Sequence, residues 1–588
     1  MPQILKFGGF ELVPSTYELR RGTRAIKIEK LAMELLLLLV SRRESLVSRE
    51  EIAERLWGKD VYVDAENGVN TAIRKIRKAL ADNSHRPKFV QRVPGKGYRF
   101  IAPVSEENRP AVSSQKRMML AVLPFANYGR DSSEDYFCDG MTEETIASLG
   151  AICPENLGVI ARTSSMAYRN TAKPISQIGK ELCVGYILES SVRREADRIR
   201  ITAQLIRVED QTHVWAANYD RERSTVLGVQ AELGRAIAEQ VLAGLPGRFS
   251  PRVQTANLDA FDLYLKGRYY FAQRSKAGIT RAIDFYNQSL ALDASYSLAN
   301  AGLADAYATL PITSDYASDN CRILGLAAAN KAVAQDENSA EAHTALAACS
   351  FWLTWDWDTA IEAARRAVEL NPSYPLAHFY LAHIFSSLCR HDEAEEEMRR
   401  AHELDPFSAH LRAIHGQMLY QAGHYDAAAV AAQRAIALNP ASWLGHMILA
   451  KAQIESGDFQ SALISLQQAF DLSGGNSEAL AWKVFALVKL GELVRAKEIV
   501  EVMKETAKTR HVPAYNLALA CNGLGDYNQA FVCLQLGSEQ NDVRMRFLPV
   551  DPRWRQMNRE DRVRGLWPPP QQHLAIGNLR MYRRQAGS

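Results

Sequence analysis

The segments VNTAIRKIRKAL (Val69–Leu80) and HRPKFVQRVPGKGYRF (His85–Phe100) decide the fold of the N-terminal part of the chain. The first predicts an amphipathic helix, because its apolar residues recur at i, i+4, i+7 and i+11. The second predicts a β-hairpin, since strand-forming residues flank the turn Pro94–Gly97, whose glycines can adopt positive φ. A basic helix beside a basic hairpin is the arrangement with which a winged helix grips a nucleic-acid duplex.

The outer face of the predicted helix carries polar and cationic side chains. Asn70, Arg74 and Arg77 share a face, and Asn and Arg can form paired hydrogen bonds with adenine and guanine edges. Cations beside them and in the hairpin suit phosphates, which fix register. The candidate DNA contacts are Asn70, Thr71, Arg74, Lys75, Arg77, Lys78, Arg92, Lys96 and Arg99. A solvated basic face on an ordinary helix is the alternative, and the adjoining hairpin favours DNA binding.

Other elements surround this pair. Leu5–Glu29 alternates short strand patterns with Gly and Pro, and Leu31–Arg43 predicts an apolar helix. Ser48, followed three residues later by Glu51, is the pattern of a capping box and predicts the start of a second helix. We therefore expect a four-stranded sheet, three helices and a terminal hairpin.

Residues Phe7–Val104 resemble the OmpR/PhoB-type winged-helix domain. The resemblance rests on LAMELLLLLV, SREEIAERLWG, VNTAIRKIRKAL and VPGKGYRFIAPV, in that order. It implies that Val69–Leu80 is the recognition helix and that Arg92–Arg99 is the wing. It also implies that the loop Gly58–Ala65 can contact RNA polymerase.

The distribution of charge supports a DNA-binding module at residues 1–104. This segment holds 20 Lys and Arg against 12 Asp and Glu, whereas the 588-residue chain holds 70 against 67. The positive field is therefore confined to the segment that would meet phosphates. Since no signal peptide is apparent and the densest apolar run, Leu31–Val40, is too short to span a membrane, we expect a soluble cytoplasmic protein.

A linker is expected at residues 105–116, followed by an α/β domain at 117–247. Its pattern is βαβα, then three strands, then a closing helix at Val226–Leu245. LAVLPF, DYFCDGMTEETI and VIARTSSMAY make it resemble the TolB amino-terminal-like domain. The acids Asp139, Glu143 and Glu144 are expected near a helix start, where they would face the helix dipole. We find no catalytic constellation, no metal-ligand spacing among the eight cysteines and no cofactor motif.

The C-terminal half is a repeat array. Alanines recur every 34 residues, at Ala360, Ala394, Ala428, Ala462, Ala496 and Ala530. Glycines recur with the same period, at Gly423, Gly457, Gly491 and Gly525. This period identifies tetratricopeptide repeats. We expect about eight helical hairpins and a cap within residues 256–548, one extra residue near Trp352–Trp357, and a disordered tail at 568–588.

The predicted fold class is multidomain, with an α+β winged helix, a central α/β domain and an all-α solenoid. The chain resembles soluble bacterial one-component regulators of the HilA type. This resemblance implies a transcriptional regulator of the activator class that binds promoter DNA, with repeats that bind a protein partner or another protomer. The alternative is a cyclase-associated or other scaffold protein with a non-essential winged helix.

Overall fold

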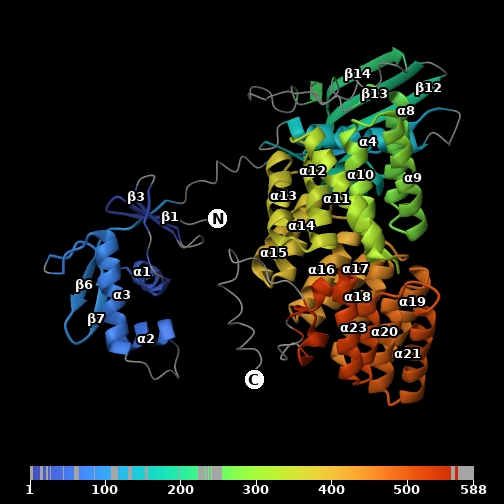
Figure 1. The fold of residues 1–588 in the computed structure, drawn as a ribbon. Coiled ribbons are helices and arrows are strands. Elements are labelled where there is room, and N and C mark those ends of the chain that lie inside the picture. Colours follow the sequence, from blue (N-terminus) through green and yellow to red (C-terminus); the bar gives the residue numbers. More distant parts are fainter. Residues whose placement is uncertain are drawn as a thin grey trace. The chain divides into compact units, whose positions relative to one another are not determined.

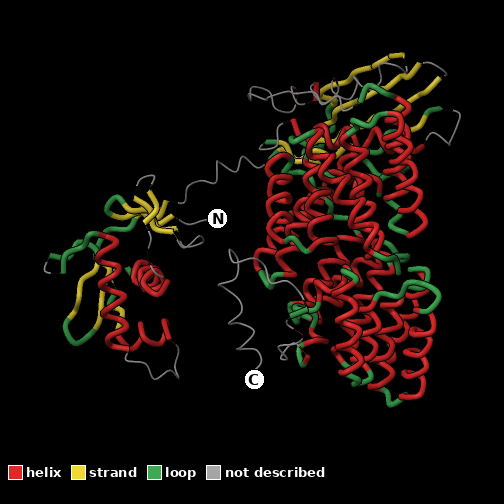
Figure 2. Tube along the Cα trace, in the orientation of Figure 1, coloured by secondary structure: helices red, strands yellow, loops and turns green. Residues whose placement is uncertain are grey.

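The computed structural model describes residues 4–13, 18–21, 24–26, 28, 30–43, 45–57, 65–84, 86–107, 117–129, 135–152, 156–195, 198–222, 232, 236–237, 240, 255–557, 563 and 565–566. The chain separates into two compact units, Met1–Lys116 and Arg117–Ser588 (Figures 1 and 2). The first combines strands with three helices. The second joins a mixed α/β domain to a long helical array, so the predicted multidomain fold class is confirmed.

An antiparallel sheet opens the first unit. Its order is β4-β3-β2-β1-β8, with strands β1 (Ile4–Phe7), β2 (Phe10–Val13), β3 (Glu18–Arg21), β4 (Arg24–Ile26) and β8 (Ser105–Glu107). The prediction of four strands and of a linker beginning at residue 105 is wrong here, because β8 pairs with β1, Glu106 opposite Leu5. Backbone groups form this ladder, so polar side chains do not prevent it.

Three helices and a second sheet complete the winged helix. These elements are α1 (Lys30–Ser41), β5 (Val47–Ser48), α2 (Arg49–Trp57), α3 (Ala65–Leu80), β6 (Val90–Val93) and β7 (Gly97–Phe100). The strand order is β5-β7-β6. Ser48 caps α2 as predicted, since its Oγ accepts a hydrogen bond from Glu51 N at 3.0 Å. Leu35, Leu36 and Leu39 of α1 have no exposed surface and form the centre of the core.

The second unit begins with an α/β domain. Its elements are β9 (Met118–Val122), β10 (Ala126–Asn127), α4 (Asp135–Ile152), β11 (Leu157–Val159), α5 (Arg162–Met166), α6 (Ile175–Leu182), β12 (Tyr186–Glu195), β13 (Arg198–Arg207) and β14 (His213–Glu222). The main path through the sheet is β11-β9-β12-β13-β14, parallel over its first three strands and antiparallel thereafter. The predicted closing helix Val226–Leu245 lies outside the described residues except at four positions, all of them helical.

The repeat array occupies a stretch that is described without a gap, residues 255–557. Its sixteen helices pair in chain order as eight hairpins: α8 (Leu258–Phe271), α9 (Lys276–Leu292), α10 (Ser297–Thr313), α11 (Ser318–Gln335), α12 (Ala340–Cys349), α13 (Trp357–Leu370), α14 (Pro375–Ser387), α15 (His391–Leu404), α16 (Ala409–Gln421), α17 (Tyr425–Leu438), α18 (Trp443–Ser456), α19 (Phe459–Leu472), α20 (Ser477–Lys489), α21 (Leu493–Ala507), α22 (Ala514–Gly523) and α23 (Tyr527–Glu539). Between α12 and α13, the π-helical turn η4 (Ser350–Thr354) lies where the extra residue was predicted.

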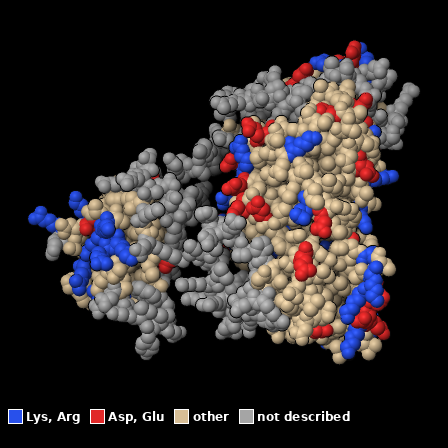
Figure 3. Space-filling model, in the orientation of Figure 1, with Lys and Arg blue, Asp and Glu red and all other residues tan. Residues whose placement is uncertain are grey.

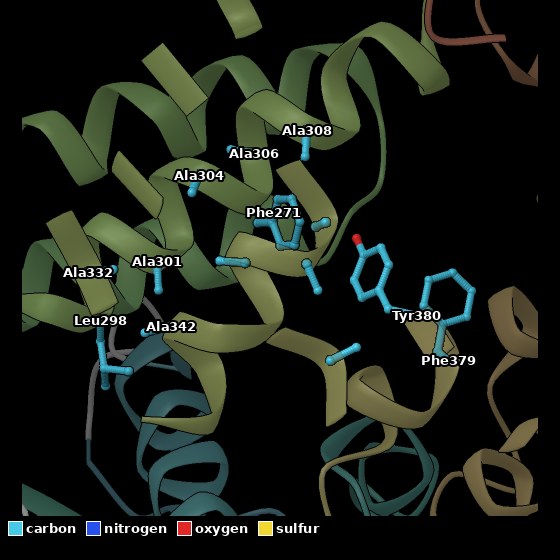
Figure 4. Packing of buried hydrophobic residues seen from close by; sticks show 14 of the residues in the cluster. Phe271, Leu298, Ala301, Ala304, Ala306, Ala308, Ala332, Ala342, Phe379 and Tyr380 are labelled. Carbon is cyan, nitrogen blue, oxygen red and sulfur yellow. The ribbon is translucent and has the colours of Figure 1, made fainter. Parts of the chain in front are cut away.

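Small residues lie at the helix contacts of the array, as the 34-residue period predicts. The six periodic alanines are at most 3% exposed, and the four periodic glycines have φ between +79° and +86°. Inside the first repeats, Ala301, Ala304 and Ala342 are buried among larger side chains such as Phe271 (Figure 4). Larger residues at these alanine positions would separate the helices.

The central domain packs directly on the repeats. Ser164 Oγ donates to Asp405 Oδ1 at 2.6 Å and accepts from Phe407 N at 2.9 Å. At α4, Gly140 lies so close to α8 that a Cβ atom there would be 2.5 Å from Leu265. A glycine therefore permits the close approach of two helices that belong to different domains.

The acids of α4 do not lie at a helix start, so that expectation is wrong. Helix α4 begins at Asp135, which places Asp139 and Glu143 in its second and third turns. Asp139 pairs with Arg162 and Arg169, and Glu143 pairs with Arg162 and with Arg268 of α8. Removing a charge from water is costly unless an opposite charge pairs with it. The ion pairs that these carboxylates form therefore also hold α4 against its neighbours.

Candidate nucleic-acid interface

Helix α3 separates a buried face from an exposed one. Val69, Ile73, Ile76 and Leu80 are at most 2% exposed and pack in the core of the first unit. On the opposite side, the side chains of Asn70, Thr71, Arg74 and Lys78 are exposed, while those of Lys75 and Arg77 are half-buried. The predicted period of α3 is therefore correct.

The β6–β7 hairpin lies beside α3 and carries the remaining candidate residues. Arg92 and Lys96 are exposed, whereas Arg99 is half-buried. Gly95 adopts a φ of +72° in the turn. Gly97 adopts a φ of +149°, and a Cβ atom there would lie 2.1 Å from the backbone oxygen of Val47. The hairpin can therefore pack against β5 only with glycine at position 97.

Two groups fasten the hairpin to α3. Arg77 Nη2 donates to the backbone oxygen of Val90 at 3.0 Å. The carboxylate of Asp82, just beyond the end of α3, accepts from Lys88 N at 2.7 Å and from Val90 N at 2.9 Å. Arg77 thus supports the hairpin as well as facing the surface. Its partner lies 13 residues away, which the helical period does not reveal.

Tyr98 is a further residue of this interface, which the sequence analysis missed. Its hydroxyl donates to Asn70 Oδ1 at 3.0 Å, and the guanidinium of Arg49 lies 5.9 Å from its ring centre. The bond uses one acceptor position of the Asn70 amide oxygen and fixes the orientation of the side chain, whose NH₂ group remains able to donate. One feature of the sequence could have indicated this contact: Tyr98 is an aromatic residue in the strand that follows the turn of the wing.

The exposed cations form one positive surface. Lys and Arg gather over α3 and the neighbouring hairpin (Figure 3). Within the described part of the chain, no salt bridge involves Arg74, Lys78, Arg92 or Lys96. Cations without a protein partner are available to phosphates. The loop Gly58–Ala65, predicted to contact RNA polymerase, lies outside the described residues except for Ala65, where α3 begins.

The described residues contain no group of three or more His, Cys, Asp or Glu that could hold a metal ion. None of their helices combines the length and the apolar character needed to cross a membrane.

A basic helix and a basic wing fastened side by side define the first unit as a winged-helix DNA-binding domain. Known families match three parts of the chain. Residues 23–100 match the family "Transcriptional regulatory protein, C terminal", and residues 115–234 match "HilA/YgeH-like transcriptional regulator, second domain". Tetratricopeptide repeats match at 346–409, 415–477 and 453–520. The chain therefore carries an OmpR/PhoB-type winged helix, a HilA-like second domain and C-terminal tetratricopeptide repeats. The TolB-like resemblance remains a prediction.

Curated relatives match parts of the chain. A protein named putative adenylate cyclase 3 from Rhizobium meliloti (strain 1021) is 34% identical over 285 residues, which cover 47% of this chain and 41% of that protein. The phosphate regulon regulatory protein PhoB of Klebsiella pneumoniae is 33% identical over 100 residues, covering 17% and 43%. The chain thus spans about two fifths of the length of these relatives.

Solved structures also match. The RstA DNA-binding domain of Klebsiella pneumoniae, in complex with the RstA box, is 25% identical, covering 17% of this chain and 96% of that one, with a TM-score of 0.16. A thermophilic tetratricopeptide-repeat protein of Thermus thermophilus is 16% identical, covering 33% and 99%, with a TM-score of 0.29.

Proposed function

We propose that the protein is a DNA-binding transcriptional regulator whose winged helix binds promoter DNA. The observation that carries the proposal is the positive surface formed by α3 and the wing. Its cations are exposed, and hydrogen bonds of Arg77 and Asp82 hold the hairpin beside α3. Support comes from the match of residues 23–100 to the C-terminal domain of transcriptional regulators and of residues 115–234 to a HilA-like second domain.

The exposed residues receive different roles. Asn70 and Arg74 project from α3 and read base edges, and Thr71 lies beside them. The cations Lys78, Arg92 and Lys96 bind phosphates and fix the register, with Lys75 and Arg99 at the margin. Arg77 acts chiefly as a positioning residue, because it donates to the hairpin at Val90.

We also propose how the protein controls transcription. We propose that the protein is a transcriptional activator in the cytoplasm and that it contacts RNA polymerase through Gly58–Ala65. The repeats bind a protein partner or a second protomer, and two winged helices occupy adjacent half-sites. Tetratricopeptide arrays present extended surfaces for such contacts.

The experiment is selection of duplexes from a random pool by the full-length protein, followed by fluorescence anisotropy on the enriched sequence. We expect one enriched motif and an affinity that falls steeply with salt. Recovery of no motif, with equal affinity for all duplexes, would contradict sequence-specific regulation.

Association with a cyclase is the second candidate, favoured by the relative named putative adenylate cyclase 3. The sequence shows no catalytic constellation, so this candidate requires a separate catalytic partner. Measuring the cyclic AMP that a purified adenylate cyclase forms from ATP and Mg²⁺, with and without this protein, separates the two candidates. A saturable change in the rate of cyclic AMP formation would favour cyclase association, and an unchanged rate would contradict it.

A further inference from the structure

Helix α4 of the central domain packs against α8 of the first repeat, beside a cluster of polar side chains. Glu144 comes from α4, Tyr264 from α8, Tyr286 from α9, Asp305 from α10 and Glu341 from α12. The hydroxyl of Tyr264 lies beside the carboxyl of Glu144 and lowers its pKa. Glu144 and Glu341 are only half-buried, so the cluster retains accessible surface although it lies between two domains.

Two buried atoms of this cluster have no hydrogen-bond partner. They are Tyr286 Oη, in a residue with no exposed surface, and Asp305 Oδ1, in a residue that is 6% exposed. The two groups lie near each other. A Cβ atom on Gly302 would lie 3.0 Å from Tyr286 Oη, and Asp305 follows Gly302 by one turn of α10. Unpaired buried polar atoms are costly, and a bound molecule that pairs with both removes that cost.

The cluster also has an excess of negative charge. Arg268 is engaged by Glu143, and Arg274, the other cation that lowers the pKa of Asp305, has its guanidinium 4.7 Å from the ring centre of Phe271. Burial, followed by the neighbouring carboxylates Glu143 and Glu341, raises the pKa of Glu144 to about 8. Burial likewise raises the pKa of Asp305 to about 6. Both shifts indicate carboxyl groups that lack a sufficient counter-charge.

Aromatic rings pack beside these groups. The ring centres of Tyr264 and Tyr286 are 6.1 Å apart, and those of Tyr264 and Tyr296 are 5.2 Å apart. Aromatic faces attract organic cations, most strongly where water is excluded.

We propose that this cluster binds a small organic cation that carries a primary ammonium group. The ammonium group donates to Asp305 and to the oxygen of Tyr286, with Glu144 supplying a further acceptor. Since Glu144 belongs to the central domain and Asp305 to the repeats, the ligand bridges both and stabilises their junction. The cluster is then an effector site, which goes beyond the proposed DNA binding and can be measured without DNA.

The experiment is isothermal titration calorimetry of the full-length protein. The probes are 1,4-diaminobutane and n-butylamine, with the uncharged butane-1,4-diol and the anion succinate as controls. The variants are Asp305→Asn and Tyr286→Phe, and the matched control is Asp284→Asn, which replaces an exposed acid of α9. Circular dichroism verifies that every variant is folded.

We expect saturable amine binding by the wild-type protein and by Asp284→Asn. Binding should be at least about tenfold weaker in Asp305→Asn, which loses the negative charge that pairs with the ammonium group, and in Tyr286→Phe, which loses the hydroxyl acceptor. Glu144 should release a proton on binding, so the observed enthalpy should depend on the ionisation enthalpy of the buffer. No saturable amine binding by folded wild-type protein would overturn the proposal, as would equal affinity in Asp305→Asn or equal binding of butane-1,4-diol. None of these outcomes bears on DNA binding.

Discussion

Arg74 and Arg77 lie one turn apart on α3 and carry the same group, yet their surroundings differ. Arg74 is exposed, whereas Arg77 is half-buried and donates to Val90 O of the hairpin. A guanidinium that is already engaged on the protein holds its own position and that of its acceptor. We therefore expect Arg77 to contribute to the stability of the winged helix and Arg74 to the recognition of DNA bases.

Replacing Arg77 by Ala should lower the free energy of unfolding of the winged helix by about 1–2 kcal/mol, because a partly buried hydrogen bond is lost. Chemical denaturation measures it. Lys78→Ala, at an exposed neighbouring position, is the matched control and should change stability by less than about 0.5 kcal/mol. Equal stability in the two variants would contradict the positioning role of Arg77.

Replacing Arg74 by Ala should instead leave stability unchanged and reduce discrimination between the selected duplex and a single-base mismatch by about 1–3 kcal/mol. Competition binding at fixed salt measures it. If Arg74→Ala weakened all duplexes by the same factor, Arg74 would be a phosphate contact rather than a reader of bases.

The exposed residues of this site were predictable from the sequence, and their internal partners were not. The 3.6-residue period fixes which side of α3 carries Asn70 and Arg74. It contains no information on the bond from Tyr98 to Asn70, which joins residues 28 positions apart. Such pairs depend on how the hairpin folds back on the helix, and only the tertiary structure determines that.

At the scale of elements, the structure of the wing depends more strongly on Gly97 than on Gly95. Gly97→Ala places a Cβ atom 2.1 Å from Val47 O at a φ of +149°, whereas Gly95→Ala meets no atom within 4 Å. We expect Gly97→Ala to displace β7 from β5 and to cost several kcal/mol, and Gly95→Ala to cost about 1 kcal/mol through its positive φ alone. Thermal denaturation compares them, and equal Tm values would contradict the packing of Gly97 on β5.

Elements with a strong period were predictable, and elements formed by pairing at a distance were not. The alanines at 34-residue spacing predicted the eight hairpins because the same close contact between helices recurs in each repeat. The polar sequence of strand β8 contains no apolar alternation and therefore predicts a linker. It forms because residues 105–107 lie beside β1, about a hundred positions away in the sequence.

At the scale of the second unit, the segment that follows the repeat array packs on the second and third hairpins. Arg546, 2% exposed, donates to the backbone oxygens of Phe351 and Trp352 in η4, and its guanidinium lies 4.2 Å from the ring centre of Trp352. Arg544 donates to Ile312 O at 3.2 Å. Contacts that span about 200 residues close the array on itself, and no repeat period predicts them.

Replacing Arg546 by Ala should lower the stability of the repeat array by about 2–5 kcal/mol, because two buried carbonyl groups lose their donors. Arg555→Ala, in the same C-terminal segment but exposed, is the matched control and should have little effect. Thermal unfolding measures both. Equal Tm values would show that the array does not depend on this closure.

Acid should destabilise the array through His383, which is 1% exposed and lies among Phe351, Trp352, Phe379 and Phe547. Burial, with a smaller effect of Arg546, lowers the pKa of His383 from 6.5 to about 3. Between these values the unfolded chain binds a proton that the folded chain does not, so stability falls as pH falls. His383→Phe should remove about 1.4 kcal/mol per pH unit of this loss. An unchanged slope in denaturation from about pH 6 to about pH 4 would contradict it.

The central claim is that α3 and the wing form a DNA-binding surface, and one measurement tests it most directly. The affinity of the full-length protein for its selected duplex is measured against salt, beside a variant in which Arg74, Arg92 and Lys96 are all replaced by Ala. We predict a loss of at least about 100-fold and a salt slope reduced by about 2, since two phosphate contacts disappear. Unchanged affinity and slope in a folded triple variant would contradict the claim.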